Sequence, residues 1–369
     1  MKTSRFAGVI AALCLVISMG ALAQADKKAA DAPAAPGLAG EEKMLKQWHD
    51  SPPPQCASKP FVFVSGSDKG TYSKIVKDIA KIPACAAFFC EAVTQGGYNN
   101  SLHLAHNYAE VGLVQVDGLD LVGSYDPHVY DLRSLVSLYP AAMHVVISSA
   151  GYKVRKEWNL TKDTVIPKGL SDLKGTPVAV WSSAVVTAKN LSDVNNLQLK
   201  LVTVTTVADG IRMLDKGEVT AFVGMGGRPV EWVSSLSRAY RLLPLTEQEV
   251  SAMIGKFPKS GYSKDSLIYD NLGQVGVTTV ASQVEVVVQD FKGSRGTQLI
   301  GLRECILDNI DDMRESKGAH QSWKLVKTPE KTLWTAYTGP KKRERAAPVA
   351  QPAPAVVSAP AAPVKPAKK

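Results

Sequence analysis

A repeated order of buried strand, glycine turn and amphipathic helix constrains most strongly what this chain can fold into. Residues 61–64 form a short run of aromatic and β-branched side chains, which is typical of a buried strand. Ser65-Gly66-Ser67 follows, and apolar residues then recur over 72–82 at the spacing of one helix face, up to Pro83. The pattern therefore predicts a strand, a tight turn and a helix in that order.

The same order recurs along the chain. Further strands are predicted at 91–94, 111–116, 132–138, 143–148, 177–181, 202–204 and 221–223. Helices are predicted to begin near Asn99 or Asn100, to begin again near Ser182, and to span 209–215. Alternating strands and helices indicate an α/β architecture with open sheets. In such sheets, ligands bind outside the carboxyl ends of the strands, where turns lead into helices.

Length and charge exclude two classes of protein. The chain has 369 residues, enough for two lobes, and its 45% apolar content excludes a wholly disordered protein. Of its formal net charge of +9, residues 1–25 contribute +2 and residues 341–369 contribute +6, which leaves +1 for residues 26–340. Since phosphate recognition requires positive charge on the folded surface, we expect no nucleic-acid partner.

The N-terminus has the pattern of a secretory signal peptide. Two basic residues precede an apolar run over 6–19, and small residues then allow cleavage after Ala23 or Ala25. The run is shorter than the roughly 20 apolar residues that cross a bilayer. Cys14 lies inside this run next to bulky side chains, which does not fit a lipidation signal. We therefore expect residues 1–25 to be a cleaved signal peptide.

Four further cysteines are Cys56, Cys85, Cys90 and Cys305. Export to an oxidising compartment favours disulfides, and four cysteines allow three pairings. Because Cys85 and Cys90 lie in one predicted loop, we expect a Cys85–Cys90 bridge and, with it, a Cys56–Cys305 bridge. No histidine lies close to the C-x4-C spacing, so we expect no metal there.

Two segments are rich in Ala, Pro and charge and are expected to build no core. The first is a linker at 26–55, which includes one possible helix at 41–49. The second is a tail at 341–369. A Pro-rich segment of this kind is expected to extend by up to about 3.1 Å per residue. Two interpretations of the tail stay open, a solubilising segment and a contact with a membrane surface or cell-wall polymer.

A series of short motifs, none specific alone, follows in a characteristic order over residues 60–320. The motifs are Gly66-Ser67, Gly70-Thr71-Tyr72, Thr94-x-Gly96-Gly97 with Asn100, Val111-Gly112-Leu113-Val114-Gln115-Val116-Asp117, Leu138-Tyr139-Pro140 with His144-Val145-Val146, Asp172-Leu173-Lys174-Gly175, Gly217-Glu218-Val219-Thr220-Ala221-Phe222, Tyr269, and Val277-Thr278-Thr279. Their order and spacing resemble the TAXI family, the extracytoplasmic solute receptors of tripartite ATP-independent periplasmic (TRAP) transporters.

This resemblance implies an α/β fold of the periplasmic-binding-protein type II, in which two lobes joined by crossover strands close on a small solute. Lobe one would comprise 56–148 and 276–335, and lobe two 149–275. The protein would be periplasmic and would bind a small organic anion, an amino acid or a dicarboxylate such as glutamate. Its partner would be a TRAP-type membrane permease.

The resemblance also implies the ligand contacts. Lobe one would supply Ser67, Thr71, Tyr72, Thr94, Gly97, Asn100, Gln115 and Asp117. In lobe two, where the chain departs from the family, we expect contacts from Ser183, Thr187 and Arg228. Hydroxyls and helix N–H groups suit a carboxylate, whereas Asp117 repels one and is expected to face an amino group or a water. For Arg228, two interpretations stay open. In one, its guanidinium binds a carboxylate through two hydrogen bonds, and in the other, it is a solvated loop residue.

The chain departs from the family mainly in lobe two. The usual Gly-Ser-Gly-Thr-like turn reads Trp181-Ser182-Ser183 here, and a backbone that carries Cβ atoms approaches an anion less closely. We find no Ser-His-Asp order or nucleophile elbow in the sequence, so we expect neither enzymatic activity nor a cofactor. The alternative function is a periplasmic scaffold that kept the fold without transport and engages the envelope through its basic Pro/Ala tail.

Overall fold

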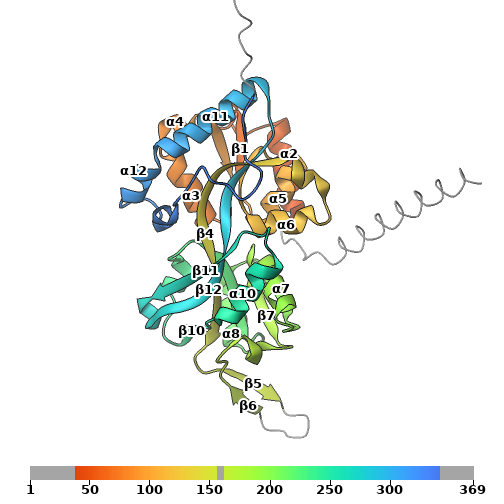
Figure 1. The fold of residues 1–369 in the computed structure, drawn as a ribbon, viewed down its shortest axis with the longest axis vertical. Helices are drawn as coiled ribbons and strands as arrows, with labels where there is room; N and C mark the ends of the chain where they lie inside the picture. Colours follow the sequence, from red (N-terminus) through yellow and green to blue (C-terminus); the bar gives the residue numbers. More distant parts are fainter. Residues whose placement is uncertain (1–37, 156–161, 341–369) are drawn as a thin grey trace, which may run out of the picture.

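The computed structural model describes residues 38–155 and 162–340, which form two α/β lobes stacked along the long axis (Figure 1). One sheet runs through both lobes in the strand order β2-β1-β3-β12-β4-β9-β7-β8, with β10 added to β4 and β11 added to β12. The expected α/β class with two lobes joined by crossover strands is confirmed. The expected signal peptide, Cys14 and the tail at 341–369 lie outside the described residues.

The elements of the described residues are as follows. The strands are β1 (Phe61–Val64), β2 (Phe89–Ala92), β3 (Val111–Gln115), β4 (Leu132–Ser148), β5 (Tyr152–Arg155), β6 (Lys162–Val165), β7 (Pro177–Trp181), β8 (Lys200–Val204), β9 (Ala221–Gly226), β10 (Tyr240–Leu242), β11 (Tyr262–Tyr269) and β12 (Gln274–Gln289). The α-helices are α2 (Leu38–Asp50), α3 (Thr71–Ala80), α4 (Pro83–Ala86), α5 (Tyr98–Ala105), α6 (Val116–Gly123), α7 (Ala184–Val194), α8 (Val207–Asp215), α9 (Glu231–Ser234), α10 (Glu247–Lys256), α11 (Gly293–Asp308) and α12 (Ile310–Glu315). The 3-10 helices are η1 (Pro127–Asp131), η2 (Leu170–Leu173), η3 (Asp270–Leu272) and η4 (Gln321–Leu325).

Both lobes use the same local strand arrangement. In lobe one, β1 lies between β2 and β3 and is parallel to both. In lobe two, β7 lies in the same way between β8 and β9. Each of these strands is followed by a helix or by a turn that leads into one, so the carboxyl ends of the strands carry helix N-termini in both lobes.

Two long strands, β4 and β12, connect the lobes. They pair with each other from Leu132↔Gln289 to Ala142↔Ala281. At Ala142, β4 also begins to pair with β9 of lobe two, and at Val284, β12 begins to pair with β3 of lobe one. The lobes therefore meet inside these two strands and not at the predicted boundaries, which lie at the strand ends. The two strands predicted at 132–138 and 143–148 are one strand, β4.

The expectation that 26–55 builds no core is wrong for its described part. Residues 38–50 form helix α2, which is longer than the predicted 41–49. Leu45 is fully buried, and Met44 and Trp48 pack against the same core as β1 and β3. These three apolar residues lie on one helix face, and that face attaches α2 to lobe one.

The predicted disulfide pairing is also wrong. The structure pairs Cys56 with Cys90 and Cys85 with Cys305, and not Cys85 with Cys90 and Cys56 with Cys305. Cys90 lies on β2, which pairs with β1, and Cys56 lies just before β1, so their Cα atoms are 5.3 Å apart. Cys85 lies on α4, which packs against α11 and its Cys305, with 5.6 Å between the Cα atoms.

We predict that both bridges stabilise lobe one, and that Cys85–Cys305 contributes more. It joins residues 220 positions apart, whereas Cys56–Cys90 spans 34 positions, and a longer closed loop restricts the unfolded chain more strongly. Replacing both members of either pair with Ser should lower the free energy of unfolding by about 2–5 kcal/mol, with the larger loss for Cys85/Cys305. Urea unfolding of the two double variants measures the difference.

A peptide map tests the pairing itself. Chymotrypsin cuts at Phe88 and Phe89, between Cys85 and Cys90, so a non-reduced digest separates the possible partners. The structure predicts linked peptides that contain Cys56 with Cys90 and Cys85 with Cys305. A peptide that links Cys85 to Cys90 contradicts it.

Candidate functional site

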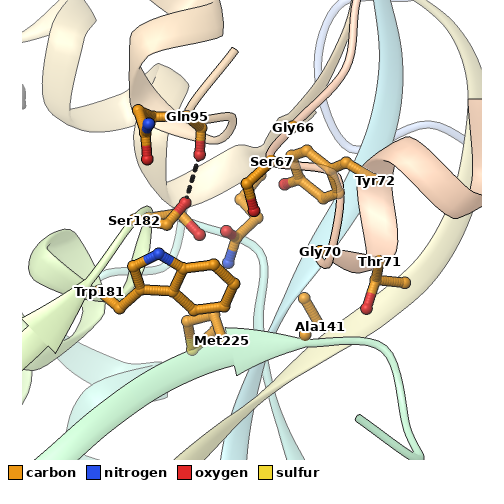
Figure 2. A pocket seen from close by; sticks show the side chains of 13 residues that line it. Gly66, Ser67, Gly70, Thr71, Tyr72, Gln95, Ala141, Trp181, Ser182 and Met225 are labelled. Carbon is orange, nitrogen blue, oxygen red and sulfur yellow. Dashed lines mark hydrogen bonds between the residues drawn. The ribbon is translucent and has the colours of Figure 1, made fainter. Parts of the chain in front are cut away.

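The strand ends of the two lobes meet at a narrow cavity with a volume of about 30 Å³ (Figure 2). Lobe one contributes the turn after β1, the start of α3, the turn after β2 and the end of β3. Lobe two contributes the end of β7 with its following turn and the end of β9. The lining residues are Gly66, Ser67, Gly70, Thr71, Tyr72, Gln95, Gln115, Ala141, Trp181, Ser182, Ser183, Met225 and Gly226.

Helix N-termini face this region from both lobes. Helix α3 begins after Gly70, α5 after Gly97 and α7 after Ser183, and no side chain caps any of the three by a hydrogen bond. Gly70 and Ser183 line the cavity itself. The first N–H groups of a helix carry partial positive charge and bind anions when no side chain occupies them.

Three buried side chains at the cavity carry polar atoms without a hydrogen-bond partner among the described residues. They are the Tyr72 hydroxyl, both polar atoms of the Gln115 carboxamide and the Trp181 indole Nε1. Tyr72 is 8% exposed, Gln115 1% and Trp181 5%. Burial raises the pKa of Tyr72 well above its usual value, so its hydroxyl keeps its proton. Buried polar groups almost always have a partner, so this cluster indicates a place where a polar ligand group binds.

The two lobes touch around the cavity. The Ser182 hydroxyl of lobe two donates to the Gln95 carbonyl of lobe one at 2.5 Å. Gly97 has a φ of +54°, and a Cβ there would lie 2.2 Å from the Cβ of Ser183, so only glycine fits this approach. The cavity is therefore seen in a closed arrangement of the lobes.

Further contacts join the lobes away from the cavity. Lys74 on α3 forms an ion pair with Glu231 on α9. On another side, the Thr187 hydroxyl of α7 donates to the Asp117 carboxylate at 2.6 Å. These contacts would break if the lobes separated.

Two of the predicted ligand residues, Thr94 and Asn100, do not line the cavity and instead support its wall by hydrogen bonds. Asn100 Nδ2 donates to the carbonyls of Ser65 at 2.6 Å and Leu113 at 2.8 Å. The Thr94 hydroxyl donates to Asn100 Oδ1 at 2.7 Å. These bonds hold the ends of β1 and β3 and the turn after β2 in one fixed arrangement.

Asp117 and Arg228 are also engaged within the protein. Asp117 was expected to face an amino group or a water, but its carboxylate accepts hydrogen bonds from Thr187, from Tyr262 at 3.0 Å and from Ser282 at 2.9 Å. Burial raises the pKa of this carboxyl. The Arg228 guanidinium lies 2.7 Å from Asp265 and outside the cavity lining.

The structure thus brings together five of the predicted residues at the cavity: Ser67, Thr71, Tyr72, Gln115 and Ser183. Gly97 and Thr187 take part in contacts between the lobes. Sequence reasoning missed Gln95, Ala141, Trp181, Ser182 and Met225 as lining residues. Four of these residues lie within or beside predicted strand ends and turns. Their position at a strand end was therefore the sequence signal that could have identified them as lining residues. Ala141 has no such signal, because it lies inside β4.

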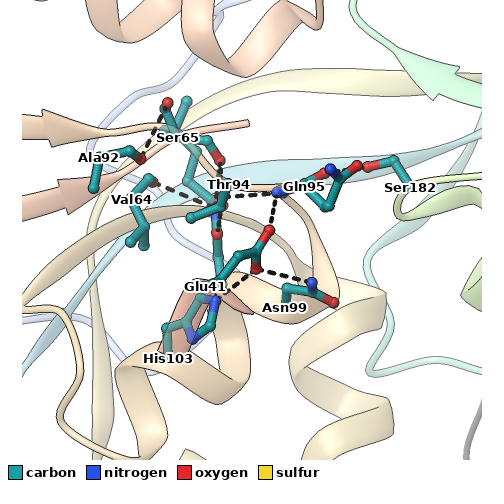
Figure 3. Close-up of polar contacts among 12 residues, drawn as sticks. Glu41, Val64, Ser65, Ala92, Thr94, Gln95, Asn99, His103 and Ser182 are labelled. Carbon is teal, nitrogen blue, oxygen red and sulfur yellow. Dashed lines mark hydrogen bonds and ion pairs between the residues drawn. The ribbon is translucent and has the colours of Figure 1, made fainter. Parts of the chain in front are cut away.

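Helix α2 braces the turn after β2. Glu41 Oε1 accepts from the Gln95 backbone N–H at 2.5 Å, and Glu41 Oε2 accepts from Asn99 at 3.0 Å (Figure 3). The same oxygen lies 2.8 Å from Nε2 of the buried His103. Because the Gln95 carbonyl meets Ser182 of lobe two, Glu41 fixes the residue through which lobe one touches lobe two.

A buried histidine supports lobe two. His144 on β4 is fully buried, and its Nδ1 donates to the Ala142 carbonyl at 3.0 Å. Its Nε2 then accepts from the Tyr269 hydroxyl at 2.8 Å, and that hydroxyl accepts from the Val230 N–H. The His144 ring also packs edge-on against Trp232. Burial away from water is the main reason why the pKa of His144 falls to about 4.

Two other kinds of site are absent from the described part of the chain. None of its helices has the length and apolar character needed to cross a membrane. Within the same residues, no group of three or more His, Cys, Asp or Glu side chains has an arrangement that could hold a metal ion.

Solved structures similar to this chain are all distant in sequence among those compared in detail. No family model matches the chain. It is similar to an arginine transport periplasmic binding protein from Legionella pneumophila, at 9% identity over 69% of this chain and 95% of that chain, with a TM-score of 0.41. It is also similar to an amino acid ABC transporter substrate-binding protein from Streptococcus pneumoniae bound to L-arginine, at 12% identity over 73% and 95% of the two chains, with a TM-score of 0.42.

A protein from Bordetella bronchiseptica is similar at 16% identity over 73% of this chain and 77% of that chain, with a TM-score of 0.45. At such identities and TM-scores, these likenesses carry no information about what this chain binds. The two-lobed arrangement rests on the strand pairing described above.

We predict that Glu41→Gln destabilises lobe one by about 2 kcal/mol, because a hydrogen bond to a charged group contributes about 1.5–3 kcal/mol. The amide of the substituted Gln would also place an N–H donor where donors from Gln95, Asn99 and His103 already point. Chemical denaturation compared with Glu42→Gln measures the effect. Equal stability of the two variants would show that the bonds of Glu41 contribute nothing.

We predict that the protein loses stability as the pH falls from about 6.5 to 4, in part through His144. The folded pKa of about 4 lies below the ordinary 6.5, so in this window the unfolded chain binds a proton that the folded chain excludes. At about 1.4 kcal/mol per pKa unit, the loss from this residue is about 3 kcal/mol across the window. Urea unfolding at several pH values measures it.

His144→Gln should flatten this pH dependence, and His49→Gln, at an exposed histidine, is the matched control. Identical slopes for the wild type and His144→Gln would contradict the assignment.

Proposed function

We propose that this protein is an extracytoplasmic solute-binding receptor that captures a small organic anion between its two lobes. The observation that carries the proposal is the set of buried polar groups of Tyr72, Gln115 and Trp181 at one cavity, which have no hydrogen-bond partner within residues 38–155 and 162–340. Tyr72 and Gln115 belong to lobe one and Trp181 to lobe two. A ligand that satisfies all three groups therefore binds the closed arrangement more tightly than an open one.

The cavity suits an oxygen-rich anionic group. Its lining contains no acidic or basic side chain and no histidine. Hydroxyls of Ser67 and Thr71, the protonated Tyr72 hydroxyl and the uncapped start of α3 supply neutral hydrogen-bond donors. Neutral donors and a helix N-terminus bind carboxylates without an opposing charge. A lining without an acid–base pair favours capture over chemistry, so we propose a binding protein and not an enzyme.

The roles of the remaining predicted residues follow from their contacts. Ser183 belongs to the ligand site, since it lines the cavity at the start of α7. Thr94 and Asn100 act as positioning residues for the lobe-one wall. Gly97, Asp117 and Thr187 act in closure, because their contacts exist only while the lobes meet. Arg228 has a structural role with Asp265.

Delivery of the ligand to a TRAP-type permease is supported by the motif series that resembles the TAXI family. The same resemblance and the signal-peptide pattern support a periplasmic location. A cycle follows from the geometry: ligand holds the lobes closed, the permease recognises that state, and opening breaks the contacts of Ser182 and Thr187.

The alternative, a periplasmic scaffold without a solute, is favoured by one observation. The closed cavity of about 30 Å³ is small, and Asp117 and Arg228 are already paired inside the protein. In this alternative, the basic Pro/Ala tail makes the functional contact with the envelope.

We predict that an organic anion at about 100 times its dissociation constant adds about 2.7 kcal/mol of stability and raises the unfolding midpoint by several degrees. Thermal unfolding of the mature protein against amino acids, dicarboxylates and 2-oxo acids measures this shift. Tyr72→Phe and Gln115→Leu remove the unpartnered groups and should abolish the shift. Tyr130→Phe, at a 56% exposed tyrosine, should retain it.

A panel without any shift, together with no small molecule released on denaturation, would contradict the receptor function and favour the scaffold. A shift that persists in both Tyr72→Phe and Gln115→Leu would place the ligand outside this cavity.

A further inference from the structure

A second and much larger hollow opens beside the narrow cavity. It has a volume of about 550 Å³, against about 30 Å³ for the cavity. It lies at the carboxyl ends of β7 and β8, between the starts of α8 and α9 and the lobe-one turn after β1. Its lining residues are Ser67, Asp68, Lys69, Trp181, Thr205, Thr206, Val207, Ala208, Ile211, Glu231, Trp232, Ser235 and Leu236. We call it the groove.

The groove adjoins the cavity, because Ser67 and Trp181 line both. A molecule that occupied the two spaces at once would pass beside these two side chains. In Figure 2 the indole of Trp181 lies between Ser67 of the lobe-one turn and Met225 at the end of β9. Trp181 therefore forms a shared wall.

The groove and the cavity differ in chemistry. The groove is lined by the side chains of Trp181, Trp232, Ile211, Val207 and Leu236. Its charged residues are already engaged in part, since Asp68 pairs with Lys77 and Glu231 pairs with Lys74. The groove therefore favours an apolar group, and its volume lies within the range of about 300–1,000 Å³ that is usual for small-molecule sites.

The cavity fits one small polar group. A space of about 10–15 Å³ holds one water, so about 30 Å³ corresponds to two oxygen-sized atoms, as in a carboxylate. The partners that such a group needs are the neutral donors of Tyr72 and Gln115 and the start of α3.

We propose that the ligand is a monocarboxylate with a bulky apolar body, whose carboxylate occupies the cavity and whose body fills the groove. This inference rests on the proposed receptor function and names the ligand class of the same site. An aromatic or branched 2-oxo acid belongs to this class. The Nε1 groups of Trp181 and Trp232, both buried and without a partner among the described residues, are available donors for a second oxygen on such a ligand.

Dicarboxylates and amino acids fit the site less well. A second carboxylate would enter an apolar groove, where burial of an unpaired charge is costly. The Arg228 guanidinium is paired with Asp265, and Lys69, the basic residue of the groove lining, is an exposed side chain. An ammonium group would need a carboxylate, but Asp117 already accepts three hydroxyl hydrogen bonds, and Asp68 and Glu231 of the groove are paired with lysines. Glutamate, which the family resemblance implies, is therefore the competitor to test.

The test compares four probes on the mature protein by calorimetry and thermal unfolding. Phenylpyruvate has a 2-oxo carboxylate and an aromatic ring, and pyruvate has the 2-oxo carboxylate without the ring. Glutamate and succinate carry a second charged group. Phenylpyruvate should bind at least about tenfold more tightly than each of the others, because filling an apolar pocket gives a discrimination of about 10–200-fold.

Substitutions in the groove test whether the apolar part of the ligand binds there. Ile211→Asp introduces a charge into the groove and should weaken phenylpyruvate by at least about tenfold. Ile254→Asp, at an exposed isoleucine of α10, is the matched control and should have no effect. Ala208→Trp fills the groove from an exposed position and gives the same test if Ile211→Asp does not fold.

The outcomes separate the inference from the function on which it rests. Tighter binding of phenylpyruvate that is lost in Ile211→Asp or Ala208→Trp supports the ligand class. Glutamate or succinate binding as tightly as phenylpyruvate, and lost in Tyr72→Phe, overturns the ligand class and leaves the receptor function intact. No binding of any of the four probes overturns the ligand class, whereas the receptor function fails only if the wider panel gives no shift and denaturation releases no small molecule. Phenylpyruvate binding that is unchanged in the groove variants overturns the placement of its body.

Discussion

The hydrogen-bonded pair of β4 and β12 is the constraint on which the rest of this structure depends. The two strands remain paired over most of their length. On the way from lobe one to lobe two, β12 exchanges β3 for β11 as its other neighbour, and β4 gains β9. The pair fixes β3 next to β12 and β9 next to β4. The strand ends and helix N-termini of both lobes therefore face each other across one narrow space. The cavity is a consequence of this connection.

Much of the fold could be predicted from the sequence, because local patterns decide it. The strands at 61–64 and 177–181 agree with β1 and β7 to the residue, since glycine or serine follows each apolar run at once. The single strand β4 was predicted as two strands, at 132–138 and 143–148, with Pro140 between them. In the structure, Pro140 pairs with Gln283 beside a register shift between β4 and β12. The hydrogen-bond ladder is interrupted at this shift, so a proline without an N–H is tolerated there.

The site could be predicted only in part, because long-range contacts decide which polar groups stay free. Ser67, Tyr72 and Gln115 line the cavity as their turns and strand ends indicated. Asn100 and Asp117 carry suitable chemistry, yet carbonyls and hydroxyls from distant elements take up their hydrogen bonds. The disulfides show the same limit. Cys85 is close to Cys90 in sequence, but α4 packs against α11 and brings it to Cys305.

The most direct measurement is the electron density between Tyr72, Gln115 and Trp181 in a crystal of the mature protein grown with phenylpyruvate. The account predicts a carboxylate within hydrogen-bond distance of the Tyr72 hydroxyl and the Gln115 amide, and an aromatic ring in the groove beside Trp181 and Ile211. An empty cavity in crystals of a closed protein at saturating phenylpyruvate, or a ligand bound elsewhere, would contradict it.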